Sequence, residues 1–67
     1  MKTSEIGANI SKIRGDNNLN QKQFGEKIGY SQRTISDWEK GNTEPNICAI
    51  RKICKIFDIS YEELIDG

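Results

Sequence analysis

The chain has 67 residues, of which 34% are hydrophobic and 30% are charged, and ten Lys and Arg residues balance ten Asp and Glu residues. This composition is typical of one small folded domain rather than a disordered chain, and the short length allows only a modest hydrophobic core. No apolar run is long enough to cross a membrane and the first residues do not open a signal peptide. We therefore expect a cytoplasmic protein with no membrane partner.

The two cysteines and the lack of histidine exclude several kinds of site. Cys48 and Cys54 are six residues apart on one expected helix, which turns their side chains roughly 240° away from each other. An internal disulfide is therefore not expected, and neither is a zinc or other metal site. The chain also has no glycine-rich phosphate loop and no catalytic motif, so we expect no cofactor and no enzyme activity.

The first half of the chain predicts three helices. A helix over residues 4–17 carries Ile6, Ile10 and Ile13 at the spacing of one buried stripe, and Asn18 suits its left-handed end. Asn20 and Gln23 form a capping-box pattern at the start of a helix over residues 21–28, which stops at Gly29. A third helix over residues 32–40 follows an N-cap at Ser31 and stops at Gly41.

The second half predicts two more helices. Pro45 and Asn46 introduce a helix over residues 47–57, whose apolar residues span more than one stripe, so it is central or faces a second partner. Ser60 and Glu63 repeat the capping-box pattern before a short last helix through Ile65. The fold class is all-α, a compact bundle of five helices in a single domain over residues 1–67.

The segment from Leu19 to Gly41 places two short helices around a tight glycine turn. This arrangement lets one helix lie in the major groove of DNA while the other braces the backbone. The zero net charge argues mildly against nucleic acid. Residues 1–41, which contain this segment, carry seven Lys and Arg against five Asp and Glu, while residues 42–67 carry three against five.

These residues have a family pattern: Asn20-Gln21-x-x-Phe24-Gly25-x-x-Ile28-Gly29-x-Ser31-x-x-Thr34-Ile35-Ser36-x-Trp38-Glu39-x-Gly41. The pattern resembles the phage repressor and Cro helix-turn-helix family, also called XRE-like regulators, and it continues through Pro45, Ile53-Cys54 and Ile59-Ser60-x-x-Glu63-Leu64. The resemblance implies a lambda repressor-like DNA-binding domain that binds double-stranded DNA and regulates transcription as a repressor. Gly25 departs from the family, which usually has alanine there.

The resemblance also implies roles for individual residues. The expected base contacts are Gln32, Arg33, Ser36 and Asp37, and the expected DNA backbone contacts are Asn20, Gln21, Ser31, Lys40, Asn42 and Thr43. In the family, a residue at the position of Gln21 clamps a phosphate and braces the one at Gln32, and the residues at Arg14 and Glu39 form a structural ion pair.

The residue types on the third helix agree with those roles. Gln pairs with adenine and Arg with guanine in the major groove, and Asp37 either accepts from cytosine or, as we prefer, orients Arg33. The alternative is that these four residues are an ordinary solvated face.

We further expect a homodimer on a palindromic operator, because one such helix reads too few base pairs to select a site. The apolar residues expected at the dimer interface are Ile56, Ile59, Tyr61, Leu64 and Ile65, in the region where Cro-like proteins pair. The alternative is that Leu64 and Ile65 only close the monomer core. A different function remains open, namely a protein-interaction module such as an antitoxin or an assembly domain.

Overall fold

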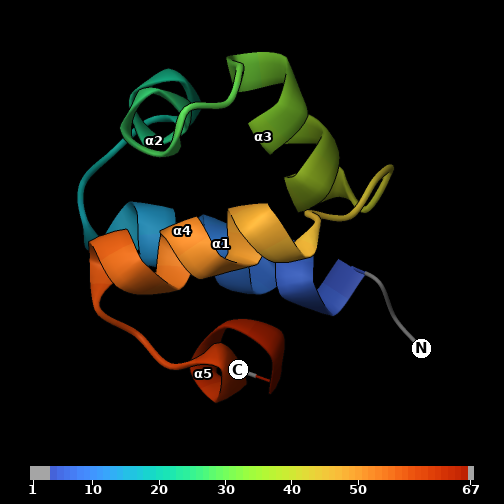
Figure 1. Ribbon diagram of the computed structural model, residues 1–67. Coiled ribbons are helices and arrows are strands. Elements are labelled where there is room, and N and C mark those ends of the chain that lie inside the picture. The colour runs from blue at the N-terminus through green and yellow to red at the C-terminus, as the bar shows by residue number, and fades with distance from the viewer. Residues whose placement is uncertain (1–3, 67) are drawn as a thin grey trace.

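The computed structural model describes residues 4–66. Over that range the chain forms five helices and no strand: α1 (Ser4–Asp16), α2 (Gln21–Ile28), α3 (Gln32–Lys40), α4 (Ile47–Phe57) and α5 (Tyr61–Asp66). The predicted all-α class is confirmed. In the view of Figure 1, α2 and α3 lie above α1 and α4, and α5 lies below them.

Helices α2, α3 and α4 begin and end where local capping chemistry predicts. Gln23 N donates to Asn20 Oδ1 at 2.7 Å, and Asn20 N donates to Gln23 Oε1 at 2.9 Å, which completes the capping box of α2. The same reciprocal pair joins Ser60 and Glu63 at the start of α5. Helix α1 ends at Asp16, one residue before the predicted end.

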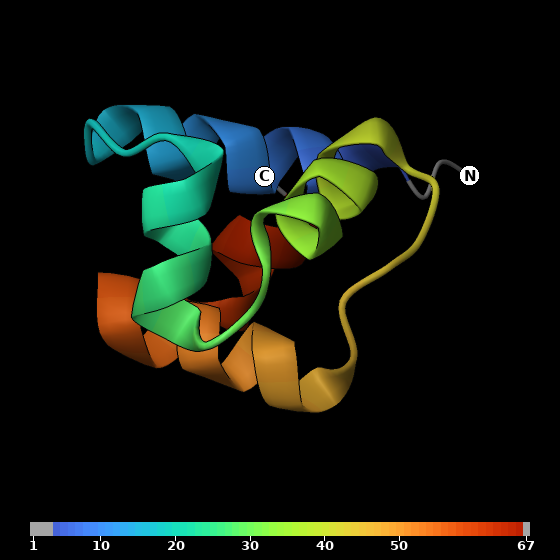
Figure 2. The same cartoon turned by 90° about the horizontal axis from the view of Figure 1, so that it is seen from above.

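The core lies where all five helices meet. The view from above in Figure 2 shows α2 crossing from α1 to α4, while α3 lies against α1. Phe24 of α2 stacks on Phe57 of α4 with ring centroids 5.0 Å apart, which ties these two helices together. The buried hydrophobic residues are Ile10, Phe24, Ile28, Ile35, Trp38, Ala49, Ile53, Cys54 and Leu64.

Two helical glycines sit where the backbone of another segment comes close. A Cβ on Gly7 of α1 would overlap the carbonyl oxygen of Trp38 in α3, and one on Gly25 of α2 would overlap the carbonyl oxygen of Tyr30. Both positions therefore lack room for a side chain. Gly25 allows α2 to approach the turn that leads into α3, a contact that its helix propensity alone does not reveal.

The C-terminal helix corrects part of the predicted dimer surface. Leu64 has no exposed surface and belongs to the monomer core, whereas its neighbour Ile65 is 44% exposed. Asn9 Nδ2 of α1 donates to the Leu64 carbonyl at 2.8 Å and holds α5 in this orientation. Ile56 and Tyr61 remain exposed, and Ile59 is partly buried against the core.

The two cysteines are free and differ in environment. Cys48 is exposed, while Cys54 is buried in the core, where burial and nearby Glu63 raise the pKa of its thiol. In the described part of the chain no helix is long and apolar enough to cross a membrane.

Candidate nucleic-acid interface

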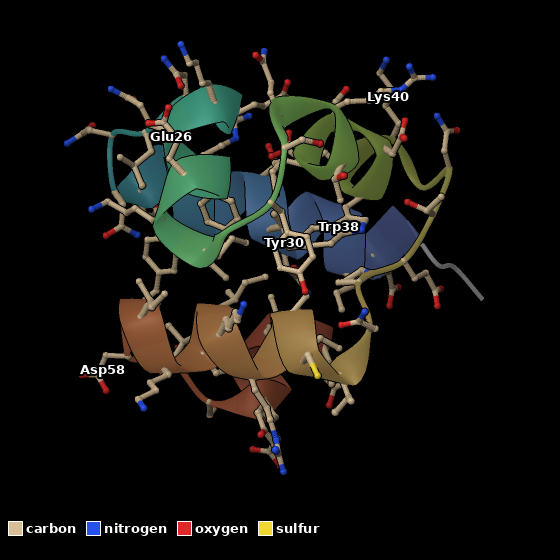
Figure 3. The ribbon with its side chains drawn as sticks, turned by 45° about the horizontal axis from the view of Figure 1, so that its top comes forward. Glu26, Tyr30, Trp38, Lys40 and Asp58 are labelled. Carbon is tan, nitrogen blue, oxygen red and sulfur yellow. The ribbon has the colours of Figure 1, made fainter. Side chains whose placement is uncertain are left out.

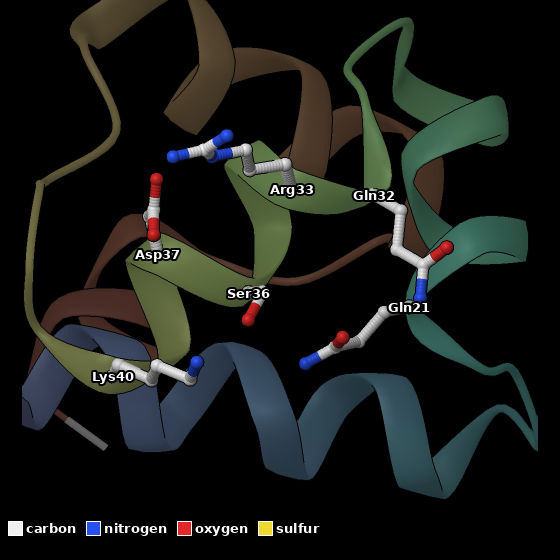
Figure 4. A pocket seen from close by; sticks show the side chains of 6 residues that line it. All are labelled: Gln21, Gln32, Arg33, Ser36, Asp37 and Lys40. Carbon is white, nitrogen blue, oxygen red and sulfur yellow. The ribbon is translucent and has the colours of Figure 1, made fainter.

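Six polar side chains gather on one surface formed by α3 and the start of α2 (Figure 4). They surround a shallow hollow of about 450 Å³, and we call this surface the polar face. Its members are Gln21, Gln32, Arg33, Ser36, Asp37 and Lys40. The structure thus brings together all four predicted base contacts and two of the predicted backbone contacts.

The polar face follows from how α3 packs. Ile35 and Trp38 of α3 are buried, which turns Arg33 to the opposite side of the helix, while Gln32 lies beside the buried stripe and is also exposed. Both exposed side chains lie in the first turn of α3. Residues at this end of such a helix can reach furthest toward an approaching partner.

Aromatic contacts hold the rear of α3 in place. Tyr30, in the turn before α3, packs against Trp38 with ring centroids 5.1 Å apart. Lys52 of α4 places its Nζ over the Tyr30 ring, 5.5 Å from the centroid, at cation–π distance. Figure 3 shows Tyr30 and Trp38 lying together between α3 and α4, away from Lys40. These contacts give α3 a fixed orientation.

The predicted ion pair between Arg14 and Glu39 is confirmed. Arg14 donates from Nε to Glu39 Oε2 at 2.7 Å and from Nη2 to Glu39 Oε1 at 3.0 Å, and this two-bond contact joins α1 to the end of α3. The hydrogen bond to Glu39 raises the pKa of Arg14 above its ordinary value. Arg14 also donates from Nη1 to the Leu19 carbonyl at 3.1 Å, which fixes the loop before α2.

Gln21 has a different partner from the one that the family resemblance implies. Its Nε2 donates to Glu39 Oε1 at 3.1 Å. Figure 4 shows the Gln21 side chain extending from α2 across the polar face toward the second half of α3. The residue that braces Gln21 is therefore Glu39, which sequence reasoning assigned only to the ion pair with Arg14.

The preferred role of Asp37, to orient Arg33, stays a prediction. The ion pairs recorded among residues 4–66 do not include one between Arg33 and Asp37. Instead, Asn42 Nδ2 donates to Asp37 Oδ1 at 3.5 Å, a long and weak contact. Figure 4 shows the guanidinium of Arg33 and the carboxylate of Asp37 turned toward one another at the same edge of α3.

The remaining predicted backbone contacts flank the polar face. Asn20 and Ser31 are exposed and cap α2 and α3 through their side-chain oxygens. Asn42 and Thr43 are exposed after α3, but their main-chain N–H groups donate to the Asp37 carbonyl at 2.9 and 3.4 Å. Their side chains, rather than those N–H groups, are left for an outside partner.

No group of three or more His, Cys, Asp or Glu side chains within residues 4–66 is arranged to hold a metal ion. The chemistry of the polar face is instead that of hydrogen bonding. Amide, hydroxyl, carboxylate, guanidinium and ammonium groups stand side by side on it. Such a set can both donate to and accept from a polar partner.

Comparisons with solved structures and characterised proteins agree with this geometry. The crystal structure of the P22 c2 repressor protein in complex with synthetic operator 9T superposes with a TM-score of 0.84 and 31% identity, over 92% of this chain and 94% of that one. The HTH-type transcriptional activator BcrR of Enterococcus faecalis is 33% identical over 94% of this chain and 31% of its own length. Antitoxin PezA of Streptococcus pneumoniae is 32% identical over 90% of this chain and 38% of its own length.

This chain thus spans about a third of the length of these two relatives. A family model described as helix-turn-helix matches residues 10–64, which include all of α2, α3 and α4. The capped α2, the Gly29 turn and α3 with its outward polar side chains are the parts that give this family its name. The chain belongs to the helix-turn-helix family.

Proposed function

We propose that this chain binds double-stranded DNA in a sequence-specific way, with α3 in the major groove, and regulates transcription as a repressor in the cytoplasm. The observation that carries the proposal is the polar face, where the predicted base contacts lie together at the exposed side of α3. The likeness to a repressor in complex with an operator supports it. So does family membership, which also favours binding over catalysis.

Within this proposal the six side chains have two kinds of task. Gln32 and Arg33, in the first turn of α3, read base edges, since Gln pairs with adenine and Arg with guanine through two hydrogen bonds. Ser36 and Asp37 lie one turn further along and contact the next bases. Gln21 and Lys40 lie at the edges of the face and contact phosphates, which position the protein without reading sequence.

A salt titration tests the proposal directly. Fluorescence anisotropy of a labelled random duplex is measured with increasing protein at several salt concentrations. Contacts to phosphates predict measurable binding at low salt that weakens steeply as salt rises. The Lys40→Ala variant, which loses one cationic contact, is expected to show a shallower salt dependence. A chain that binds no duplex at any salt concentration contradicts the proposal.

We further propose that the working unit is a homodimer on a palindromic operator. Three exposed apolar side chains support this, Ile56 at the end of α4 and Tyr61 and Ile65 on α5, with the partly buried Ile59 between them in the chain. Leu64 is not part of the interface, because it is buried in the monomer core. A twofold axis near α5 would place the two copies of α3 about 34 Å apart, one turn of DNA.

A second candidate function is an interaction module that binds another protein. The likeness to an antitoxin and the zero net charge of the chain favour it. The same anisotropy titration separates the two functions. An interaction module shows no salt-dependent duplex binding, whereas a DNA reader does.

A further inference from the structure

The carboxylate of Glu39 lies at the centre of a chain of contacts that runs from α1 to the polar face. Its Oε1 accepts from Arg14 Nη2 at 3.0 Å and from Gln21 Nε2 at 3.1 Å, while its Oε2 accepts from Arg14 Nε at 2.7 Å. The side chains of Arg14 and Glu39 are only 22% and 10% exposed. The carboxylate is therefore shielded from water, and it joins its own helix, α3, to both α1 and α2.

This arrangement decides which way the Gln21 amide points. A glutamine amide has an N–H₂ end and a carbonyl end, and on an open surface either can face a given neighbour. A carboxylate can only accept hydrogen bonds, so Glu39 selects the N–H₂ end of Gln21. The carbonyl oxygen and the second amide hydrogen of Gln21 are then left for the polar face, where Gln32 also lies (Figure 4).

Arg14 makes this selection compatible with an anionic partner. A bare carboxylate so close to the polar face would repel phosphate groups. The two hydrogen bonds from the Arg14 guanidinium compensate the charge of Glu39 without removing its ability to accept from Gln21. Arg14 on α1 therefore supports, through Glu39, the orientation in which Gln21 on α2 presents its amide.

We propose that Glu39 is a positioning residue for DNA binding, which fixes the Gln21 carboxamide in the orientation that contacts the DNA. This inference rests on the proposed function and adds a role for a residue that does not itself line the polar face. The competing account is that Glu39 only joins α1 to α3. The two accounts differ in what happens to DNA affinity when the fold is kept.

The test is the Glu39→Gln variant, measured on the duplex that wild type selects from a random pool. Glutamine has nearly the same shape and can still accept from Arg14, but its amide can face Gln21 with either end. Positioning predicts an affinity loss of about threefold to tenfold, the size of one net hydrogen bond. The matched control is Glu26→Gln, which removes the same charge from an exposed position on α2. Loss of a negative charge alone strengthens DNA binding or leaves it unchanged.

A double-mutant cycle with Gln21→Ala separates positioning from a general loss of structure. If Glu39 acts through Gln21, then Gln21→Ala weakens binding less in the Glu39→Gln background than in wild type. The side-chain amide NMR signals of Gln21 in the free protein should also shift in Glu39→Gln and stay in place in Glu26→Gln. If Glu39→Gln melts below the assay temperature, Glu39→Asp replaces it in the test. Aspartate keeps the charge but withdraws the carboxylate from Gln21 by one methylene, so this variant should also weaken DNA binding.

The outcomes are distinguishable. The positioning role is overturned if the wild-type chain binds DNA and the Glu39→Gln variant binds it as tightly as Glu26→Gln does. Additive effects in the double-mutant cycle overturn it as well. In both cases the proposed function still stands. A wild-type chain that selects and binds no duplex overturns the proposed function and the positioning role with it.

Discussion

At the scale of single residues, Gly25 shows how a position that weakens a helix can be required by packing. Glycine in a helix interior costs up to about 1 kcal/mol relative to alanine. At Gly25, however, a Cβ would overlap the Tyr30 carbonyl, whose position belongs to the turn between α2 and α3. The loss of helix propensity therefore has a structural reason in this chain.

We expect Gly25→Ala to destabilise the domain by about 1–3 kcal/mol, the usual cost of overpacking. Gly15 is the matched control, because it lies in α1 with nothing within 4 Å of the Cβ it would gain. Gly15→Ala should be neutral or stabilising by up to about 1 kcal/mol. Urea or thermal unfolding measures both variants. A Gly25→Ala variant at least as stable as wild type would contradict the packing seen here.

The Arg14–Glu39 pair gives a second prediction at this scale. Arg14→Ala leaves the shielded Glu39 carboxylate without its cation and removes the bond to the Leu19 carbonyl. Part of this loss is screened by water, so we expect a cost of about 2 kcal/mol rather than that of a fully buried pair. Thermal melts give the stability. Site selection should return the wild-type base preference with lower overall affinity, since Arg14 lies outside the polar face; a changed preference would contradict this role.

At the scale of elements, the proposed function gives the side chains of α3 two roles, base reading by Gln32 and Arg33 and phosphate contact by Lys40. Gln32→Ala and Arg33→Ala should each weaken binding to the preferred site by about 1–3 kcal/mol and relax preference at one base position. Lys40→Ala should weaken binding to all sequences alike. Selection experiments with the three variants measure this, and identical behaviour of all three would refute the division of roles.

The helices themselves were largely predictable from the sequence. The predicted bounds of the second, third and fourth helices match the structure, because their ends depend on local pairs such as Asn20 with Gln23 and on left-handed residues such as Gly29 and Gly41. Local chemistry of this kind needs no knowledge of the fold. The grouping of Gln32 and Arg33 on one face followed from helical periodicity in the same way.

The features that sequence reasoning missed depend on long-range packing. The Gln21–Glu39 hydrogen bond spans 18 residues, and the approach of Gly7 to Trp38 depends on how α1 crosses α3. The orientation of α5 was equally hidden, because a helix of six residues is too short for periodicity to show which side faces the core. For this reason the sequence alone leaves open whether Leu64 joins Ile65 at a dimer interface or closes the monomer core.

At the scale of the whole molecule, the exposed apolar residues at the end of α4 and on α5 predict association, namely Ile56, Tyr61 and Ile65. Ile65→Glu should shift the chain toward monomer and weaken binding to its selected site, because it places a charge in the proposed interface. Ile47→Glu is the control. Ile47 is exposed on α4 like Ile56, but it lies nine positions earlier, which places it about half a turn away around the helix and outside the proposed interface. Sedimentation at micromolar concentration measures the oligomeric state of both variants, and fluorescence anisotropy measures their binding to the selected site. A wild-type chain that is monomeric throughout would rule out the dimer.

The central claim is that α3 reads a DNA sequence, and selection from a random duplex pool tests it most directly. Wild-type protein should enrich a single motif with twofold symmetry and half-sites about one helical turn apart. The Gln32→Ala variant should lose preference at one position in each half-site while it keeps the others. Selection that enriches no motif, or a motif that Gln32→Ala and Arg33→Ala leave unchanged, would contradict the account.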